Sequence, residues 1–398
     1  MSSRGDSLTT PALGDLAVAF DKIAEAARDR LPVNGLTHNF YRYPARFSPR
    51  FAAAAIECFS VPGDVIADPY MGGGTAIVEG VVAGREVIGN DLNSLAAFIT
   101  KVKITRITAS DADGLLRWAR EVVPCLNYRT PAEDVADFID PVKTKNLSLV
   151  RARFIKKLVA VAIRSIEALE SKRARDFARC AVLRVSQWAL DGRERHTSLQ
   201  HFREKLASTT EEMLVAINQL SERVRESGGR ASLFNLDAAD LHTAKPFSGH
   251  GKRVSLVVTS PPYPGVHVLY HRWQVDGRRE TPAPYWITGC NDGNGASFYN
   301  FGDRRQAAAD NYFSNSLTTL RGIRRIMRDG GIVVQMVAFN SPEEQLQRYL
   351  ENMRLAGFDE LPVGIERIWR EVPNRKWHAQ LRGLTASANE VVLVHQAH

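Results

Sequence analysis

A glycine-rich turn between a strand pattern and a helical pattern is the feature that most constrains the fold. Residues 65–68 form a short β-rich run, and the turn that follows contains Gly72, Gly73 and Gly74. A helical pattern at 75–83 and a second strand pattern at 86–90 come next. A strand, a helix and another strand in this order predict a βαβ unit, and therefore a parallel sheet.

The same turn predicts a ligand site. Glycines let the backbone approach a ligand closely, and Asp91 follows the second strand, where an acid can accept hydrogen bonds from ribose hydroxyls. The turn lacks the lysine of a P-loop, and Asp68 at its mouth would repel a pyrophosphate. A cationic nucleoside such as S-adenosylmethionine is therefore favoured over a nucleotide phosphate.

A second motif lies far downstream. The apolar run at 254–259 ends in Ser260, Pro261, Pro262 and Tyr263. Two prolines stop a strand ladder and keep the backbone extended. The hydroxyl and the exposed carbonyls can accept hydrogen bonds from an amine, while the tyrosine ring stacks on a flat base. Alone, this motif is also an ordinary turn; together with the glycine turn and Asp91 it predicts methyl transfer to an exocyclic amino group.

These two motifs resemble those of a known family. Residues 68–75 and 259–263 look like the cofactor and catalytic motifs of the amino-group DNA methyltransferases, which methylate cytosine N4 or adenine N6. The stretch 38–49 is similar to the segment that precedes the glycine motif in many members and there lies against the methionine end of the cofactor. This chain has Tyr70 for the usual Phe and Gly73 for the usual Ser, so an aromatic and a small residue are retained.

The resemblance covers roughly residues 36–105 and 230–345 and implies a Rossmann-like, S-adenosylmethionine-dependent methyltransferase sheet of the α/β class. It implies that the Ser-Pro-Pro-Tyr motif is catalytic. An acid after the strand at 231–237 binds the cofactor adenine in the family; Asp237 is the closer match and Asp240 is the alternative. The expected cofactor-binding residues are Arg46, Phe47, Asp68, Tyr70, Gly72, Gly74, Thr75, Asp91 and Asp237.

The resemblance also implies the substrate, double-stranded DNA with a flipped target base. Serine at position 260 is typical of the cytosine-N4 branch, whereas adenine-N6 enzymes usually have an acid there. Adenine-N6 methylation and a catalytically idle DNA-binding protein on the same scaffold remain alternatives. RNA guanine-N2 and protein glutamine methyltransferases fit the cofactor motif less well. Companion restriction or defence proteins are compatible with this interpretation.

Between 107 and 228 the strand patterns stop and helical patterns take over. We expect a disordered N-terminus at 1–13, a catalytic domain made of 14–106 and 229–398, and a large all-helical insertion at 107–228. Residues 143–205 contain 16 Lys and Arg against 6 Asp and Glu. This excess favours a surface that contacts DNA phosphates, although a solvated helical face, or a scaffold that only covers the catalytic domain, is the alternative.

A long segment at 264–305 mixes aromatic and basic residues without clear periodicity. Long loops in compact domains are often functional, and aromatics beside arginines suit base stacking and phosphate contact. The expected DNA-contacting residues are His271, Arg272, Arg278, Arg279 and, in a second basic cluster, Arg375. Packing of the loop on the insertion, and a solvated turn around Arg375, are the alternatives.

Other features exclude whole classes of protein. No run of about 18 apolar residues predicts a membrane span. The cysteines Cys58, Cys125, Cys180 and Cys290 are scattered, which argues against structural zinc or a disulfide framework and favours a reducing cytoplasm. Cys125 follows a proline, as the nucleophile of cytosine-C5 methyltransferases does, but its Glu-Asn-Val partner motif is missing, so a structural role is expected.

Overall fold

The computed structural model describes residues 13–43, 46–150, 152–192, 197–247, 253–264, 272–275, 277, 279–293, 301, 307–339, 341–361, 367–371 and 389–398. The predicted disorder at 1–13 lies outside these residues except at Leu13, where helix α1 (Leu13–Arg28) begins. Among the described residues, no helix is long and apolar enough to cross a membrane.

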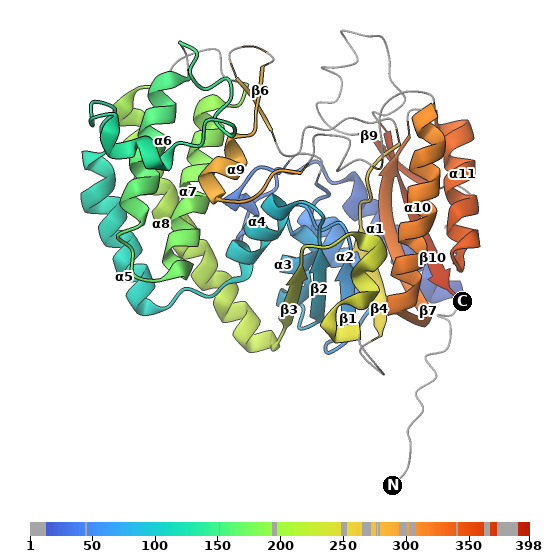
Figure 1. Ribbon diagram of the computed structural model, residues 1–398. Helices are drawn as coiled ribbons and strands as arrows, with labels where there is room; N and C mark the ends of the chain where they lie inside the picture. Colours follow the sequence, from blue (N-terminus) through green and yellow to red (C-terminus); the bar gives the residue numbers. More distant parts are fainter. Residues whose placement is uncertain are drawn as a thin grey trace.

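The centre of the molecule is a twisted sheet whose strands follow the order β3-β2-β1-β4-β7-β10-β8 (Figure 1). The strands β1 (Val65–Asp68), β2 (Glu86–Asn90), β3 (Arg230–Phe234), β4 (Val254–Thr259) and β7 (Met327–Ala338) are parallel to one another. Strand β10 (Asn389–Ala397) is antiparallel to β7, β8 (Phe358–Glu360) and β9 (Ile368–Glu371). The predicted α/β fold class is confirmed: this is a mostly parallel, Rossmann-like sheet with an antiparallel edge.

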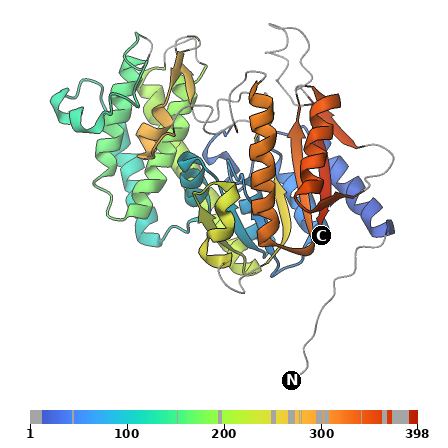
Figure 2. The ribbon, with the colours of Figure 1, turned by 45° about the vertical axis from the view of Figure 1, so that its right-hand side comes forward.

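Alternating side chains of the sheet enter two apolar cores. On β10, Val392 and Val394 belong to one core, while Val391 and Leu393 belong to the other. This alternation follows from the pleat, since successive side chains point to opposite faces. Helices α10 (Ala307–Ile326) and α11 (Pro342–Leu355) cover one face, as Figures 1 and 2 show. Both faces are therefore buried, which explains why β4 is buried at every position.

On the other face lie α1, α2 (Pro49–Phe59), α3 (Thr75–Val82) and α4 (Ser94–Ile104). Two of their starts are set by side-chain caps. The Ser48 hydroxyl accepts a hydrogen bond from the Phe51 amide at 3.1 Å, and the Asn93 side chain accepts one from the Leu95 amide at 2.9 Å. The Ser48 cap sets the residue at which α2 begins, and the Asn93 cap sets the residue at which α4 begins after β2.

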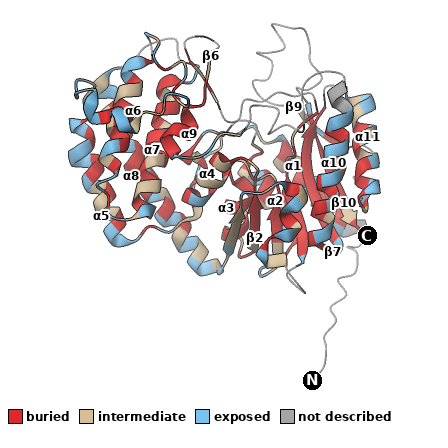
Figure 3. Cartoon of the chain, in the orientation of Figure 1, coloured by how far each residue is buried: buried red, intermediate tan, exposed pale blue. Residues whose placement is uncertain are grey.

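The chain between α4 and β3 forms a helical lobe beside the sheet (Figure 1). It contains α5 (Ala109–Arg117), α6 (Arg153–Ile166), α7 (Lys172–Leu190) and α8 (Leu199–Ser227). Helix α7 is central and largely buried, with α6 and α8 against it, whereas the outer helices have exposed polar faces (Figure 3). Contacts of α8 with α3 and α4 join the lobe to the sheet.

The described part of the aromatic and basic segment after β4 packs on this helical lobe. It contains the hairpin β5 (Trp273–Val275) and β6 (Arg279–Thr281) and helix α9 (Ala283–Thr288), elements too short to give a sequence periodicity. The Gly192 amide donates to the Gln274 carbonyl at 2.9 Å, and the Trp286 indole donates to the Phe138 carbonyl at 2.6 Å. Residues from beyond β4 are thus part of the lobe.

Candidate functional site

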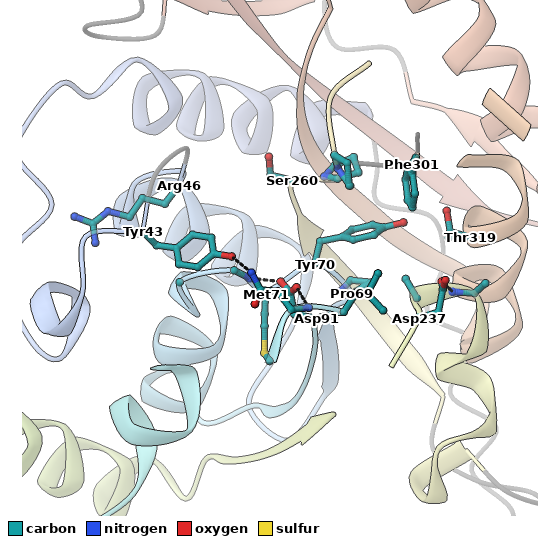
Figure 4. A pocket seen from close by; sticks show the side chains of 18 of the residues that line it. Tyr43, Arg46, Pro69, Tyr70, Met71, Asp91, Asp237, Ser260, Phe301 and Thr319 are labelled. Atoms are coloured by element: carbon teal, nitrogen blue, oxygen red, sulfur yellow. Dashed lines mark hydrogen bonds between the residues drawn. The ribbon is translucent and has the colours of Figure 1, made fainter. Parts of the chain in front are cut away.

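A cavity of about 610 Å³ opens at the carboxyl ends of β1, β2, β3 and β4 (Figure 4). This is where α/β sheets bind ligands. Ten of the residues predicted from the sequence line it: Arg46, Phe47, Tyr70, Gly72, Thr75, Asp91, Asp237, Ser260, Pro261 and Pro262. Asp68, Gly74 and Tyr263 were predicted with them but are not part of the wall.

The glycine turn follows β1 and is shaped by its neighbours. Gly72 and Gly74 have φ of 45° and 73°, which side chains rarely adopt. A Cβ at Gly74 would lie 2.6 Å from the Thr100 hydroxyl, and a Cβ at Gly73 would lie 2.9 Å from the Cβ of Tyr43. Tyr43, in the segment before α2, packs directly against the turn. A side chain at position 73 would collide with it, so only glycine fits there.

Asp91 stands at the end of β2, facing this turn. One carboxylate oxygen accepts a hydrogen bond from the Gly72 amide at 2.8 Å, and the other accepts one from the Asn93 amide at 2.8 Å. Burial raises the pKa of Asp91 to about 6, against the lowering effect of these amides. Each oxygen can accept a further hydrogen bond, so a diol in the cavity could bind the same carboxylate.

Asn90 is a structural residue of the site that the sequence reasoning missed. Its side chain is completely buried. The amide nitrogen donates to the Pro69 carbonyl at 3.2 Å and to the Leu236 carbonyl at 3.1 Å, and its oxygen accepts from the Leu236 amide at 3.1 Å. The ends of β1, β2 and β3 are thus joined by one side chain. The sequence feature that could have indicated this role is an asparagine side chain at the end of a largely apolar strand.

Asp68 lies beneath the wall of the cavity and is 1% exposed. Its Oδ1 atom accepts hydrogen bonds from the Thr259 hydroxyl at 2.6 Å and from the Tyr70 amide at 3.1 Å. Burial raises the pKa of this carboxyl to about 7. The hydrogen bond between Asp68 and Thr259 joins the end of β1 to the end of β4. The contact of Asp68 with the cofactor stays a prediction.

The end of β4 forms the far wall of the cavity. The Ser260 hydroxyl donates to the Met336 carbonyl at 3.0 Å and lies 2.9 Å from the Tyr263 hydroxyl. The Tyr312 hydroxyl donates to the Pro262 carbonyl at 2.7 Å. Within the described part of the chain, the Pro261 carbonyl has no hydrogen-bond donor. An amine in the cavity could therefore use the Ser260 and Pro261 oxygens.

Tyr263 does not line the cavity. Its ring is 4% exposed, and its hydroxyl donates to Glu390 at 2.9 Å. In this conformation the ring is not available for the predicted stacking on a base. Other aromatic residues line the wall: Tyr43, Phe47, Tyr70 and Phe301. The rings of Tyr70 and Phe301 have centroids 6.0 Å apart and planes at 78°. Phe301 was within the aromatic segment after β4, but its sequence context did not distinguish it from its neighbours.

The opposite end of the cavity carries Asp237, which is exposed. Its carboxylate accepts a hydrogen bond from the Ala239 amide at 2.9 Å and so caps the helical turn after β3. The alternative acid, Asp240, is exposed but does not line the cavity. Thr318 and Thr319 of α10 line the same space, and Figure 4 shows Thr319 there. No motif in the sequence marked these threonines.

Two basic groups lie near the glycine turn. Arg46 donates to the His38 carbonyl at 2.9 Å, and burial lowers its pKa to about 10. In Figure 4 its guanidinium points away from Asp91 and Ser260. Lys103, which no motif predicted, is buried and donates to the Gly73 carbonyl at 2.6 Å; burial lowers its pKa to about 7. This lysine therefore stabilises the glycine turn through a buried hydrogen bond.

The residues predicted to contact DNA are not all described. His271, Arg278 and Arg375 lie outside the described residues. Arg272 forms ion pairs with Asp292 at 3.0 Å and with Glu280 at 3.9 Å, while Arg279 is exposed on β6. Several basic residues of the helical lobe are also paired with acids: Arg164 with Asp134, Arg173 with Asp111, Arg179 with Glu167 and Arg184 with Glu212. Cys125 is exposed on the lobe and does not line the cavity.

Comparisons with known proteins find similar sequences for a short part of the chain. Residues 26–101 match the N6/N4 methyltransferase family model, described as DNA methylase. Over 78 residues the chain is 41% identical to the Type II methyltransferase M.MvaI of Kocuria varians, which is 19% of this chain and 17% of that protein. Over 92 residues it is 29% identical to the Type II methyltransferase M.MjaII of Methanocaldococcus jannaschii, 23% of this chain and 16% of that protein.

The matched segment spans less than a fifth of each curated relative. Among solved structures, an rRNA methyltransferase, aviRa from Streptomyces viridochromogenes, aligns over 93% of this chain and 94% of its own with 13% identity and a TM-score of 0.37. The family resemblance is confirmed over residues 26–101, the part of the chain that carries the glycine turn and Asp91. The choice between cytosine N4 and adenine N6 is not made by these matches.

A first prediction concerns the charge of Asp68. Between about pH 4 and pH 7 the unfolded chain loses this proton while the folded chain keeps it, so the free energy of unfolding falls as pH rises, by up to about 1.4 kcal/mol per pH unit. Asp68→Asn keeps the oxygen that accepts both hydrogen bonds and removes the titration. Urea unfolding at pH 5, 6 and 7 measures the free energy of unfolding. This free energy should fall less with rising pH in Asp68→Asn than in the wild type. The exposed Asp240→Asn is the control, and equal slopes for wild type and Asp68→Asn would contradict the prediction.

A second prediction concerns Gly73, where the family usually has serine. Gly73→Ser should weaken binding of S-adenosylhomocysteine by about tenfold or more, because its Cβ would meet the Cβ of Tyr43 at 2.9 Å and displace the turn. Gly63→Ala is the control, since its positive φ costs stability but nothing lies within 4 Å of the added Cβ. Calorimetric titration gives both affinities. Tight binding by Gly73→Ser would show that Tyr43 does not restrict the turn.

Proposed function

We propose that this chain, which is related to the amino-group DNA methyltransferases, moves a methyl group from S-adenosylmethionine to the exocyclic N4 amine of a cytosine in DNA. One observation carries the proposal: the acids Asp91 and Asp237 and the strand end Ser260-Pro261-Pro262 line one cavity. Ser260 favours cytosine N4, since serine at this place resembles that branch. Adenine N6 is the alternative, because the same pocket would serve it.

The residues of the cavity suit the cofactor. Its volume of about 610 Å³ lies within the range of small-molecule sites, roughly 300–1,000 Å³. Asp91 would accept hydrogen bonds from the ribose hydroxyls, and Asp237 would accept one from the adenine amino group. The glycine turn leaves room for the backbone to approach the ligand. When bound, S-adenosylmethionine supplies an electrophilic methyl group on a sulfonium.

Ser260 and Pro261 would act on the other reactant. The lone pair of a cytosine amino group is delocalised into the ring, which makes the nitrogen a poor nucleophile. Hydrogen bonds from this amine to the Ser260 hydroxyl and the Pro261 carbonyl would hold the nitrogen toward tetrahedral geometry and free its lone pair. The residues would contribute mainly by positioning, which is worth up to about 7–11 kcal/mol of the barrier when geometry is right. No covalent intermediate with the protein is needed.

The substrate would be double-stranded DNA whose target base leaves the stack, because a paired base cannot reach a cavity at the strand ends. The helical lobe, with β5, β6 and α9 on it, is the candidate for DNA recognition. This assignment keeps the predicted division into a catalytic domain (14–106 and 229–398) and a helical insertion (107–228), except that β5, β6 and α9 pack with the lobe. A cytoplasmic location and companion restriction or defence proteins remain predictions.

The cofactor assignment predicts distinct roles for three acids at strand ends. Asp91→Ala and Asp237→Ala should each weaken S-adenosylmethionine binding by about 10-fold or more, because each removes a charged hydrogen-bond acceptor from the wall. Asp240→Ala is the matched control, since this acid lies outside the wall. Cofactor-dependent thermal stabilisation measures the effect. If Asp240→Ala weakened cofactor binding and Asp237→Ala did not, Asp240 and not Asp237 would be the partner of the adenine amino group.

The DNA assignment predicts different effects for two arginines of the hairpin. Arg279→Ala should lower DNA affinity and reduce the salt slope by about 1, as the loss of one phosphate contact does. Arg272→Ala should lower stability more than DNA affinity, because its guanidinium is bound by Asp292 and Glu280. Arg354→Ala on α11 is the control. Filter binding over a salt series measures this, and an unchanged slope in Arg279→Ala would argue against DNA contact by the hairpin.

A further inference from the structure

A chain of buried polar groups runs from Ser260 away from the cavity. The Ser260 hydroxyl lies 2.9 Å from the Tyr263 hydroxyl, which lies 2.9 Å from a carboxylate oxygen of Glu390. The other oxygen of Glu390 accepts a hydrogen bond from the Arg370 guanidinium at 2.7 Å. Tyr263 and Glu390 are 4% and 2% exposed. The chain thus links the catalytic tip of β4 to β10 and β9, distant in sequence from both motifs.

Counting hydrogens fixes the direction of this chain. Arg370 is always a cation, and an ion-paired carboxylate such as Glu390 only accepts hydrogen bonds. The Tyr263 hydroxyl therefore donates to Glu390 and presents its oxygen to Ser260 as an acceptor. The second inner partner of Ser260, the Met336 carbonyl at 3.0 Å, is also an acceptor. The single hydrogen of Ser260 is drawn inward, and its oxygen lone pairs are left for the cavity.

We propose that Glu390 and Arg370 are positioning residues that act through Tyr263 and orient the Ser260 hydroxyl as a hydrogen-bond acceptor toward the amine of the target base. This rests on the proposed function, because only an amine substrate needs an acceptor there. Tyr263 is then a positioning residue through its hydroxyl, in place of the stacking surface predicted from the sequence.

The cost of the buried pair supports a role beyond stability. Removing two charges from water offsets most of the attraction between them, so a buried ion pair contributes little to folding on its own. Arg370 also donates to the Ala27 carbonyl at the end of α1 at 3.4 Å, which holds the guanidinium in place. Nearby, Glu371 pairs with Arg30 at 3.4 Å near the surface, and as the strand neighbour of Arg370 it presents its side chain to the opposite face of β9.

The test uses conservative variants and a methyl-transfer assay on DNA. Tyr263→Phe keeps the ring and removes the hydroxyl, so a stacking role predicts near wild-type kcat, whereas a positioning role predicts a loss of about 10-fold or more. Glu390→Gln can donate to the Tyr263 oxygen and turn the tyrosine hydroxyl toward Ser260, which consumes a serine lone pair. We expect a similar loss of kcat, with unchanged S-adenosylmethionine affinity because Glu390 lies outside the cofactor cavity.

Glu371→Gln is the matched control, since it removes a carboxylate from β9 without touching the chain, and it should leave kcat unchanged. The double variant Tyr263→Phe with Glu390→Gln should be no slower than the slower single variant, because both changes break the same chain. Cofactor-dependent thermal stabilisation confirms that each variant is folded.

Losses that multiply in the double variant, or wild-type kcat in either single variant, would overturn the inference while leaving the proposed function intact. A wild-type protein that binds S-adenosylmethionine but labels no DNA would overturn the proposed function, and the inference with it. The two failures are thus distinguished by the wild-type reaction alone.

Discussion

The site depends on side-chain hydrogen bonds that fasten neighbouring strand ends to each other. Asn90 joins the tips of β1, β2 and β3, and the Thr259 hydroxyl joins β4 to β1 through Asp68. Parallel strands end at the same edge of a sheet, but their loops diverge unless something holds them. These buried bonds set the distance between the acids at one end of the cavity and Ser260 at the other. A positioning mechanism needs such a fixed separation.

The buried ionisable groups follow from the same arrangement. Asp68, Asp91 and Lys103 all lie at or beneath the glycine turn, where burial shifts their pKa values toward the neutral forms. Each has hydrogen-bond partners that limit this cost, including the Gly72 amide and the Gly73 carbonyl. Of these three groups only Asp91 lines the cavity, and a carboxyl with a perturbed pKa in a cavity is typical of a functional site. The Gly72 amide and the Gly73 carbonyl of the turn thus each have a buried side-chain partner.

Much of the fold and of the cavity wall could be predicted from the sequence, because both depend on local patterns. The glycine turn, Asp91 and the Ser-Pro-Pro-Tyr motif each follow a strand, and parallel strands bring their ends together. The role of Asn90 could not be predicted, since its partners Pro69 and Leu236 are fixed only by strand order. The burial of Tyr263 depends on Glu390, which is 127 residues away. The packing of β5 on the lobe depends on tertiary contacts that leave no periodicity.

The central claim is that one ligand spans the acids and the strand end Ser260-Pro261-Pro262. A crystal structure with S-adenosylhomocysteine tests it most directly. The account predicts ribose hydroxyls on Asp91, the adenine amino group near Asp237, and the sulfur atom facing Ser260 and Pro261. A nucleoside bound elsewhere, or a sulfur atom directed away from Ser260, would contradict it.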